Sequence, residues 1–194
     1  MADDAWLVVG LGNPGPSYAG NRHNIGYMVV DELAARMGGK LKSAKQVQAD
    51  VTEGRLGGIP GVRAIVARPR TYMNESGGPV SGLLRFFKSS PAKLVVIHDE
   101  LDIGFDTLRT KFGGGDNGHN GLKSIRRSID TGDYFRIRVG VGRPPGRQSP
   151  ADFVLDDFSS TERKDLPFVI DRTADAVECL LMEGLEATQG KYNS

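Results

Sequence analysis

The fold prediction starts from the stretch Ala5-Trp6-Leu7-Val8-Val9-Gly10 (residues 5–10). It is a short apolar run, rich in β-branched residues, that ends at a glycine, and this pattern predicts a buried strand. A second buried strand is predicted over 94–97, and further strands over 47–51, 62–67, 105–110 and 134–141.

Helices are predicted between these strands. Apolar residues recur at helical spacing from Ile25 to Met37, with Asn21 as the expected N-cap and a Gly-Gly pair as the stop. A second helix is expected over 76–88, and another begins near Asn120, after a glycine-rich loop.

The C-terminal part contains two capping patterns, which begin at Ser149 and Ser159, and the second heads a long amphipathic helix that ends near Gly184. Strands interleaved with helices predict an α/β fold. We expect one domain over 1–194, with a twisted mixed and largely parallel sheet sandwiched between helices. The ends, 1–4 and 186–194, are expected to be flexible.

Composition limits the classes of protein that this chain could be. Of its 194 residues, 39% are hydrophobic and 25% are charged, so a core is available. No apolar run approaches the ~20 residues that a membrane span needs, and the acidic start does not resemble a secretory signal. The single cysteine, Cys179, excludes an intramolecular disulfide and a cysteine-rich zinc site. These features predict a soluble protein of the cytoplasm.

Charge is distributed unevenly along the chain. Residues 104–147 contain nine basic and four acidic residues, whereas 148–194 contain four basic and ten acidic ones. A basic face that attracts a polyanion would explain this pattern, and an ordinary solvated surface is the alternative.

The motif Gly10-x-Gly12-x-x-Gly15 follows the first strand, which suggests a dinucleotide site. However, the expected helix is delayed until about Asn21, and no acidic residue ends the second strand as that fold requires. A plain tight turn is therefore the stronger interpretation.

Two polar clusters are candidates for acid–base chemistry. His23 lies at a helix start, where the helix dipole favours the neutral imidazole that a general base needs. The sequence His-Asp-Glu-Leu-Asp (98–102) follows a buried strand, and one of its carboxylates would orient an imidazole. Alternatively, a metal site would use this second cluster together with one more histidine; the candidate ligands are His98, Asp99, Glu100, Asp102 and either His23 or His119.

Two further segments are candidates for binding. The glycine-rich stretch 111–121, flanked by Lys111 and Lys123, would let the backbone approach a phosphate or sugar closely. Asn74 would orient a carbonyl or a water molecule, or would simply cap a helix. Since G-x-S-x-G is absent, an activated water is favoured over a covalent nucleophile.

Taken together, these motifs resemble the bacterial peptidyl-tRNA hydrolase family. The resemblance covers about 6–184 and rests on GLGNPG (10–15), Tyr18, RHNIG (22–26), TYMNESG (71–77), HDELD (98–102), GGGDNGHNG (113–121) and RIRVGVGRP (136–144). It implies a monomeric esterase that needs no metal or cofactor and cleaves the bond between a peptide and the 3′ ribose of tRNA. Asn21, where the family would be expected to have threonine, is a departure from the pattern.

The resemblance also implies roles for individual residues. His23 would be the catalytic base and Asp99 would orient it. The expected substrate-binding or oxyanion residues are Asn13, Tyr18, Met73, Asn74 and Asn120, with Gly118 and His119 in support. Lys111 and Arg138 would hold a phosphate of the tRNA. The role of Asp116-Asn117 within the glycine-rich loop is left open.

Three alternatives to this activity remain open at this stage. They are a metal-dependent hydrolase, an RNA-binding module without catalytic activity and a nucleotide-binding protein. The implied partner is tRNA, with no membrane and no obligate protein partner.

Overall fold

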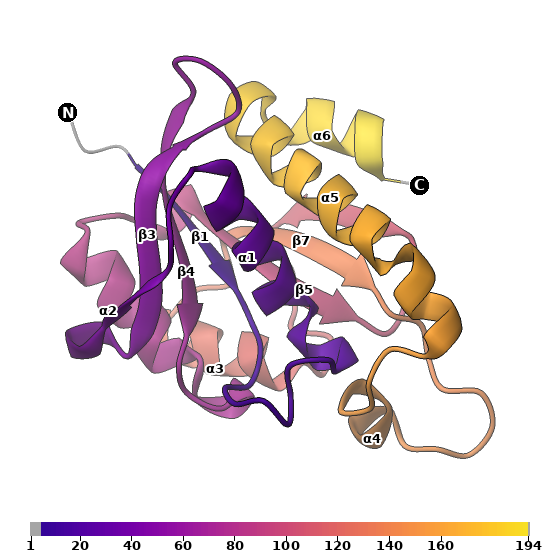
Figure 1. Ribbon diagram of the computed structural model, residues 1–194. Helices are drawn as coiled ribbons and strands as arrows, with labels where there is room; N and C mark the ends of the chain where they lie inside the picture. The colour runs from indigo at the N-terminus through magenta and orange to yellow at the C-terminus, as the bar shows by residue number, and fades with distance from the viewer. Residues whose placement is uncertain (1–4, 194) are drawn as a thin grey trace.

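The computed structural model describes residues 5–193, which form a seven-stranded sheet with helices on both faces (Figure 1). The strands are β1 (Trp6–Gly10), β2 (Lys42–Ala44), β3 (Ala49–Leu56), β4 (Val62–Pro69), β5 (Leu94–Glu100), β6 (Leu108–Phe112) and β7 (Phe135–Gly140). The helices are α1 (Ile25–Arg36), α2 (Gly77–Phe86), α3 (Asn120–Ile129), α4 (Pro150–Val154), α5 (Ser160–Glu183) and α6 (Leu185–Tyr192). Short 3-10 helices cover η1 (Arg22–Asn24), η2 (Lys45–Val47), η3 (Met73–Glu75) and η4 (Pro91–Lys93).

The sheet is mixed, with the strand order β2-β3-β4-β1-β5-β7-β6. Its four central strands, β4, β1, β5 and β7, are parallel, whereas β2 and β3 at one edge and β6 at the other are antiparallel to their neighbours. The predicted α/β architecture is thus confirmed, with the parallel pairing confined to the centre. The carboxyl ends of the parallel strands β1, β4 and β5 lie at the same end of the sheet, where polar groups gather in folds of this kind.

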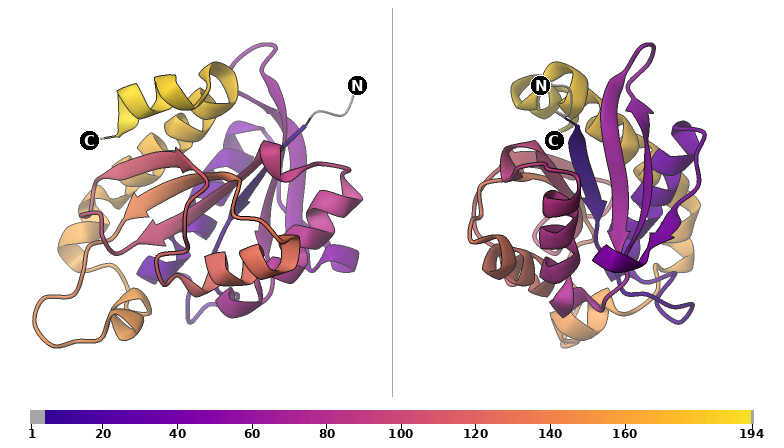
Figure 2. Two further views of the ribbon diagram at one scale, coloured as in Figure 1. Left: turned by 180° about the vertical axis from the view of Figure 1, so that it is seen from behind. Right: turned by 90° about the vertical axis from the view of Figure 1, so that its left-hand side faces the viewer.

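Side chains of β1 alternate between two cores. Val8 packs with residues of α1 and α5 on one face, whereas Leu7 and Val9 pack with residues of α2 and α3 on the other. Figure 2 shows the helices on the two sides of the sheet. Because every residue of β5 is buried as well, its end is held rigidly at the centre of the molecule.

A close backbone contact places the start of α1 against the sheet. A Cβ atom on Gly26 would lie 2.4 Å from the backbone nitrogen of Leu11 and 2.6 Å from the carbonyl oxygen of Ile97. Only glycine allows this approach, so Gly26 brings η1, which carries His23, directly over the ends of β1 and β5.

Several local predictions need correction. The strand expected over 47–51 begins at residue 49, after η2, and the one expected over 105–110 begins at residue 108. Asn21 does not cap a helix with its side chain, but donates to Oδ1 of Asp157 at 2.7 Å. At α5 the capping box of Ser159 is complete, whereas at α4 only half of the pattern forms, because Ser149 accepts from the backbone of Asp152 without a return bond.

The C-terminal segment differs from the flexible end predicted for 186–194. Residues Leu185–Tyr192 form α6, which packs against β6, and Oδ1 of Asn193 accepts a hydrogen bond from the backbone nitrogen of Thr110 at 2.8 Å. Pairing with an edge strand therefore orders this segment. Residues 1–4 and 194, also predicted to be flexible, lie outside the described residues. No helix within 5–193 has the length and apolar character to cross a membrane.

Candidate active site

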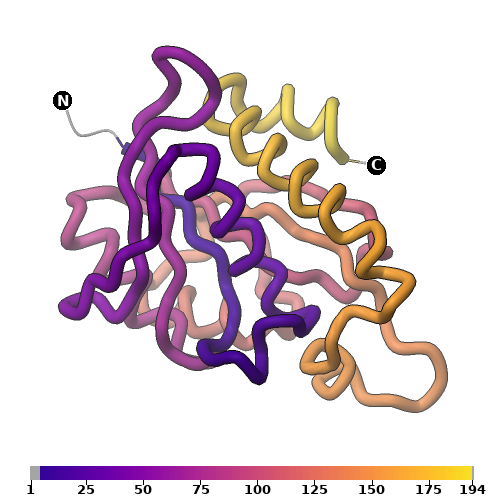
Figure 3. The backbone as a smooth tube through the Cα atoms, in the orientation of Figure 1, coloured from indigo at the N-terminus to yellow at the C-terminus, as the bar shows by residue number. Residues whose placement is uncertain are grey.

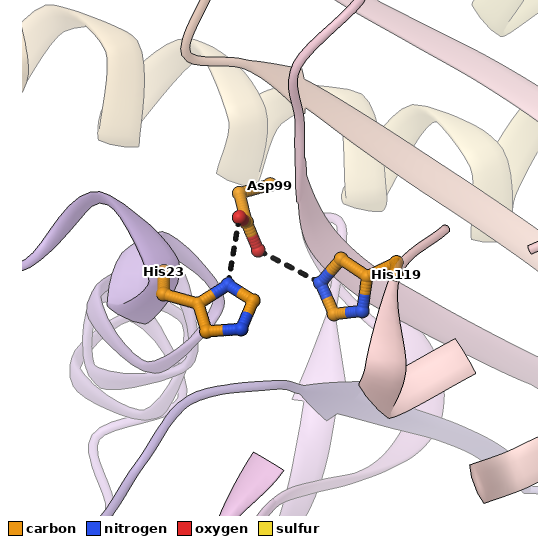
Figure 4. Close-up of side chains that lie close together, drawn as sticks. All are labelled: His23, Asp99 and His119. Carbon is orange, nitrogen blue, oxygen red and sulfur yellow. Dashed lines mark hydrogen bonds and ion pairs between the residues drawn. The ribbon is translucent and has the colours of Figure 1, made fainter. Parts of the chain in front are cut away.

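Three side chains from different elements meet at the carboxyl end of the central strand β5 (Figure 4). Nδ1 of His23, on η1, lies 2.8 Å from Oδ2 of Asp99, at the end of β5. Nε2 of His119, which precedes α3, lies 2.8 Å from Oδ1 of the same carboxylate. Asp99 is only 3% exposed, so it is a buried carboxylate held between two imidazoles.

The hydrogen bonds of His119 determine where the protons lie. Its Nδ1 accepts from the backbone nitrogens of Gly121 at 3.1 Å and Leu122 at 3.4 Å, as the N-cap of α3. An accepting Nδ1 carries no proton, so Nε2 carries it and donates to Asp99. The other carboxylate oxygen accepts from Nδ1–H of His23, which leaves Nε2 of His23 as an unprotonated acceptor.

The charge of Asp99 increases the proton affinity of His23. Burial lowers the pKa of His23, but the charge and hydrogen bond of Asp99 outweigh it and raise the pKa above the usual 6.5. Burial likewise raises the pKa of Asp99, yet His23 and His119 hold it well below its usual range. The carboxylate of Asp99 therefore stays ionised. From the sequence, the helix dipole is expected to favour a neutral His23, but the effect of Asp99 on the pKa of His23 is in the opposite direction and outweighs burial.

A cavity of about 540 Å³ opens beside this cluster. Its polar lining includes Asn13, Asn74, Asn117, Gly118, Asn120, Arg143 and the two histidines. Its apolar side is formed by Met73, Leu101 and the α4 region, where Pro150, Ala151, Val154 and Leu155 line the wall. One cavity thus places a base, amide groups and an apolar surface together.

Asn13 presents a fixed donor to this cavity. Its Oδ1 accepts from the backbone nitrogen of Met73 at 2.7 Å, and its backbone is bonded in both directions to the side chain of Asn24 at 2.9 Å. The accepting oxygen fixes the amide orientation, and Nδ2 of Asn13 makes no hydrogen bond to any of the described residues. Asn74 and Asn120 also line the cavity but are exposed.

One predicted binding residue lies outside the cavity, and one of the two alternative roles of another is excluded. Tyr18 does not line the cavity; its ring lies edge-on to that of Tyr72, with centroids 6.1 Å apart. Asn74 lies in η3, and α2 begins after Ser76, so the alternative role of Asn74 as a helix cap is wrong.

The two residues predicted to bind phosphate lie on neighbouring strands outside this cavity. Nε of Arg138, on β7, lies 3.2 Å from Oε1 of the buried Glu100. Burial lowers the pKa of Lys111, on β6, and the charges of Arg138 and Arg136 lower it further. An anion between these cations would relieve their mutual repulsion.

Comparisons with known proteins agree with this geometry. The family model for peptidyl-tRNA hydrolase matches residues 7–194. The peptidyl-tRNA hydrolase of Streptomyces avermitilis is 59% identical and covers 100% of this chain and 96% of its own length, and that of Rhodococcus erythropolis is 57% identical over the whole of both. The chain belongs to the peptidyl-tRNA hydrolase family.

The fold of the family is shared as well. A crystal structure of peptidyl-tRNA hydrolase from Acinetobacter baumannii matches with a TM-score of 0.89 at 33% identity, and covers 100% of this chain and 96% of that chain. Membership of the peptidyl-tRNA hydrolase family, which the motifs predicted, is therefore confirmed. The roles of individual residues stay predictions.

The ligands expected for a metal-dependent hydrolase are not gathered as predicted. Burial and the charge of His119 lower the pKa of His98 to about 3, and its Nδ1 donates to the carbonyl oxygen of Asp99 at 2.8 Å. Glu100 is bonded to Arg138 and Asn117. Ligand atoms of His23, Asp99 and His119 do lie within 4.8 Å of one another, and Nδ1 of His23 and Nε2 of His119 are hydrogen-bonded to Asp99.

The glycine-rich loop is held by an arginine that the sequence did not single out. Arg136 is buried and donates to the carbonyl oxygens of Gly114 and Gly132 at 2.9 Å, and also to that of Gly115. This anchoring places Gly118 and His119 at the cavity. The other glycine motif, 10–15, is followed by a loop, and α1 begins only at Ile25, so the motif does not open directly into a helix as a pyrophosphate site requires.

Sequence reasoning also missed Arg22 and the α4 wall. Nη2 of Arg22 lies 2.9 Å from Oε1 of Glu162, Nη1 donates to the carbonyl oxygen of Phe153, and the guanidinium stacks 3.9 Å above the ring of Phe153. The residue beside His23 therefore ties η1 to α4 and α5. The only signal in the sequence was the position of Arg22 next to His23.

Proposed function

We propose that this protein hydrolyses the ester bond of peptidyl-tRNA and releases a free peptide and tRNA. The observation that carries the proposal is the 2.8 Å contact between Nδ1 of His23 and the buried Asp99, at a cavity lined with amide groups, because this contact leaves Nε2 as the nitrogen that can accept a proton. The identity of the substrate is inferred from family membership, because the relatives are peptidyl-tRNA hydrolases.

The reaction begins with a water molecule in the cavity. Nε2 of His23 takes a proton from the water as its oxygen attacks the ester carbonyl, and the imidazolium that forms is stabilised by Asp99. The tetrahedral intermediate then expels the 3′ oxygen of the ribose, which receives the proton back from His23. General-base assistance of this kind contributes roughly 10²–10⁴-fold.

Asn13 supplies the donor for the oxyanion in this proposal. A pre-oriented donor stabilises developing negative charge without reorganising during the reaction. Among the four asparagines that line the cavity, Asn13 is the buried one and its amide is fixed by Met73. Its loss is expected to lower kcat by about 10²–10³-fold.

Recognition of the tRNA body uses charge rather than sequence. In the register of β6 and β7, Arg138 is opposite Arg109 and Lys111 is opposite Arg136. Residues 109 and 111 are two positions apart on β6 and share a face, so Lys111 and Arg138 lie on the same face of the two paired strands. Contacts to phosphates hold any tRNA without reading its bases, which suits an enzyme that accepts many tRNAs. We further propose that the protein acts as a monomer in the cytoplasm and uses no metal or cofactor.

The deciding experiment incubates N-blocked aminoacyl-tRNA with the wild type and with His23→Ala, with and without a chelator. The wild type is expected to release the acyl group at the same rate in both conditions, and His23→Ala is expected to bind tRNA but release almost none. Binding without release by the wild type would favour an RNA-binding module, and loss of activity with chelator would favour a metal enzyme. Near-normal turnover by a folded His23→Ala variant would refute the role of His23.

A further inference from the structure

Arg143 is the one lysine or arginine that lines the 540 Å³ cavity within residues 5–193. It lies on the extended loop between β7 and α4, which projects from the body of the molecule in Figure 3. Its side chain is 54% exposed, so it is open to solvent as well as to the cavity.

Arg143 is held in place by a single carboxylate oxygen. Both Nε and Nη2 of Arg143 lie 2.7 Å from Oδ1 of Asp102, whose side chain is 43% exposed. An ion pair this exposed contributes little to stability, so its exchange for another anion costs little. Arg143 therefore has a weakly held partner that a stronger anion would displace.

Asp102 keeps a second partner of its own. Nδ2 of Asn117 donates to Oδ2 of Asp102 at 2.6 Å and to Oε2 of Glu100 at 2.6 Å. If Arg143 turned to a ligand, Asn117 and the surrounding water would still satisfy the carboxylate. The neighbouring Arg138 is different, because its partner, Glu100, is only 5% exposed.

We propose that Arg143 binds the phosphodiester that precedes the terminal nucleoside of the substrate, and that Asp102 holds its place until the substrate arrives. The inference rests on the proposed function, which puts the ester at His23 in the same cavity. A guanidinium forms bidentate hydrogen bonds with phosphate, and a phosphate offers more acceptor oxygens than the one that Asp102 now provides. The site would thus read one backbone phosphate close to the scissile bond, separately from Lys111 and Arg138.

The test compares three esters of the same N-blocked amino acid: with adenosine, which has no phosphate; with the dinucleotide CpA, which has one; and with full-length tRNA. The variants are Arg143→Gln, Asp102→Asn and, as a matched control, Arg147→Gln, since Arg147 lies on the same loop but does not line the cavity. Should the small esters react too slowly, inhibition of the tRNA reaction by CpA and by adenosine gives the same comparison.

Arg143→Gln is expected to lower kcat/KM about tenfold for CpA and tRNA esters, the loss typical of one charge-assisted contact, and less than about twofold for the adenosine ester. Asp102→Asn is expected to raise kcat/KM for the two phosphate-bearing esters, because it removes the competing anion. Arg147→Gln is expected to leave the small esters unchanged.

Several outcomes would overturn the proposal. If Arg143→Gln slowed the adenosine ester as much as the others, Arg143 would only shape the cavity. If Asp102→Asn lowered the rates as Arg143→Gln does, the ion pair itself would be the requirement. Equal losses in Arg147→Gln would indicate a net-charge effect. A wild type that hydrolyses none of the esters would refute the proposed function itself. This result differs from the outcomes above, in which the wild type is active and only the role of Arg143 fails.

Discussion

Replacing Asp99 with asparagine is expected to inactivate the enzyme by moving a proton within His23. Nδ1 of His119 accepts from backbone N–H groups of α3, so its Nε2–H must donate to the residue at position 99. The new amide must therefore turn its oxygen towards His119 and its NH₂ group towards His23. Facing a donor, Nδ1 of His23 would have to accept, and its proton would move to Nε2, where the water must be activated.

The size of the loss follows from this tautomer error. In serine proteases, the same change in the carboxylate that orients histidine costs ~10⁴-fold in kcat. We expect a loss of about 10³–10⁴-fold here, or roughly 4–5.5 kcal/mol in activation free energy. Because Asp99 is buried beneath the imidazoles, KM should change little. Single-turnover hydrolysis of N-blocked aminoacyl-tRNA with excess enzyme measures the chemical step.

A second substitution tests the reasoning itself. In Asp99→Asn combined with His119→Ala, nothing forces the amide to face position 119, so its oxygen can accept from Nδ1–H of His23 again. We therefore expect the double variant to be at least about tenfold faster than Asp99→Asn alone, although His119→Ala by itself is expected to slow the wild type. A double variant no faster than Asp99→Asn, or an Asp99→Asn variant within tenfold of the wild type, would refute the argument.

Three other outcomes are expected. Because the pKa of His23 is raised above 6.5 in the free protein and its unprotonated form is the base, kcat/KM should rise with pH through a midpoint above 6.5 and be lost below it; a midpoint below 6.5 would contradict this. Lys111→Ala and Arg138→Ala should each raise KM far more than they lower kcat and reduce the slope of log(kcat/KM) against log[salt] by about 0.7–0.9 per lost phosphate contact, whereas an unchanged slope would remove the assignment. Gly26→Ala, whose Cβ would lie 2.4 Å from a backbone nitrogen, should lower the unfolding free energy in urea by about 2–3 kcal/mol, while the control Gly190→Ala, with open space around it, should not.

The central strands were predictable because their burial is written locally. The runs at 6–10 and 94–97 are apolar on both faces, and strands with this pattern lie inside a sheet that helices cover on both sides. The edges were less predictable. The exposed β2 has no apolar alternation, and α6 is ordered by its contact with β6, a partner more than 70 residues away.

The candidate site was predictable in its residues but not in its connections. His23 stood out because of its chemistry and its position at a helix start, whereas the family resemblance was needed to select Asp99 from the carboxylates of 98–102. The structure places the two in hydrogen-bond contact. The second bond to Asp99, from His119, depends on how the glycine-rich loop folds back over β5. That path depends on Arg136, whose role as an anchor for carbonyl groups cannot be read from a run of alternating strand residues.

The most direct test of the account is the ¹⁵N NMR spectrum of the His23 imidazole at a pH above its midpoint. The account predicts a protonated Nδ1 and a bare Nε2 in the wild type, and the reverse in Asp99→Asn. A wild-type spectrum with the proton on Nε2 would contradict the claim that His23 is held ready to activate water.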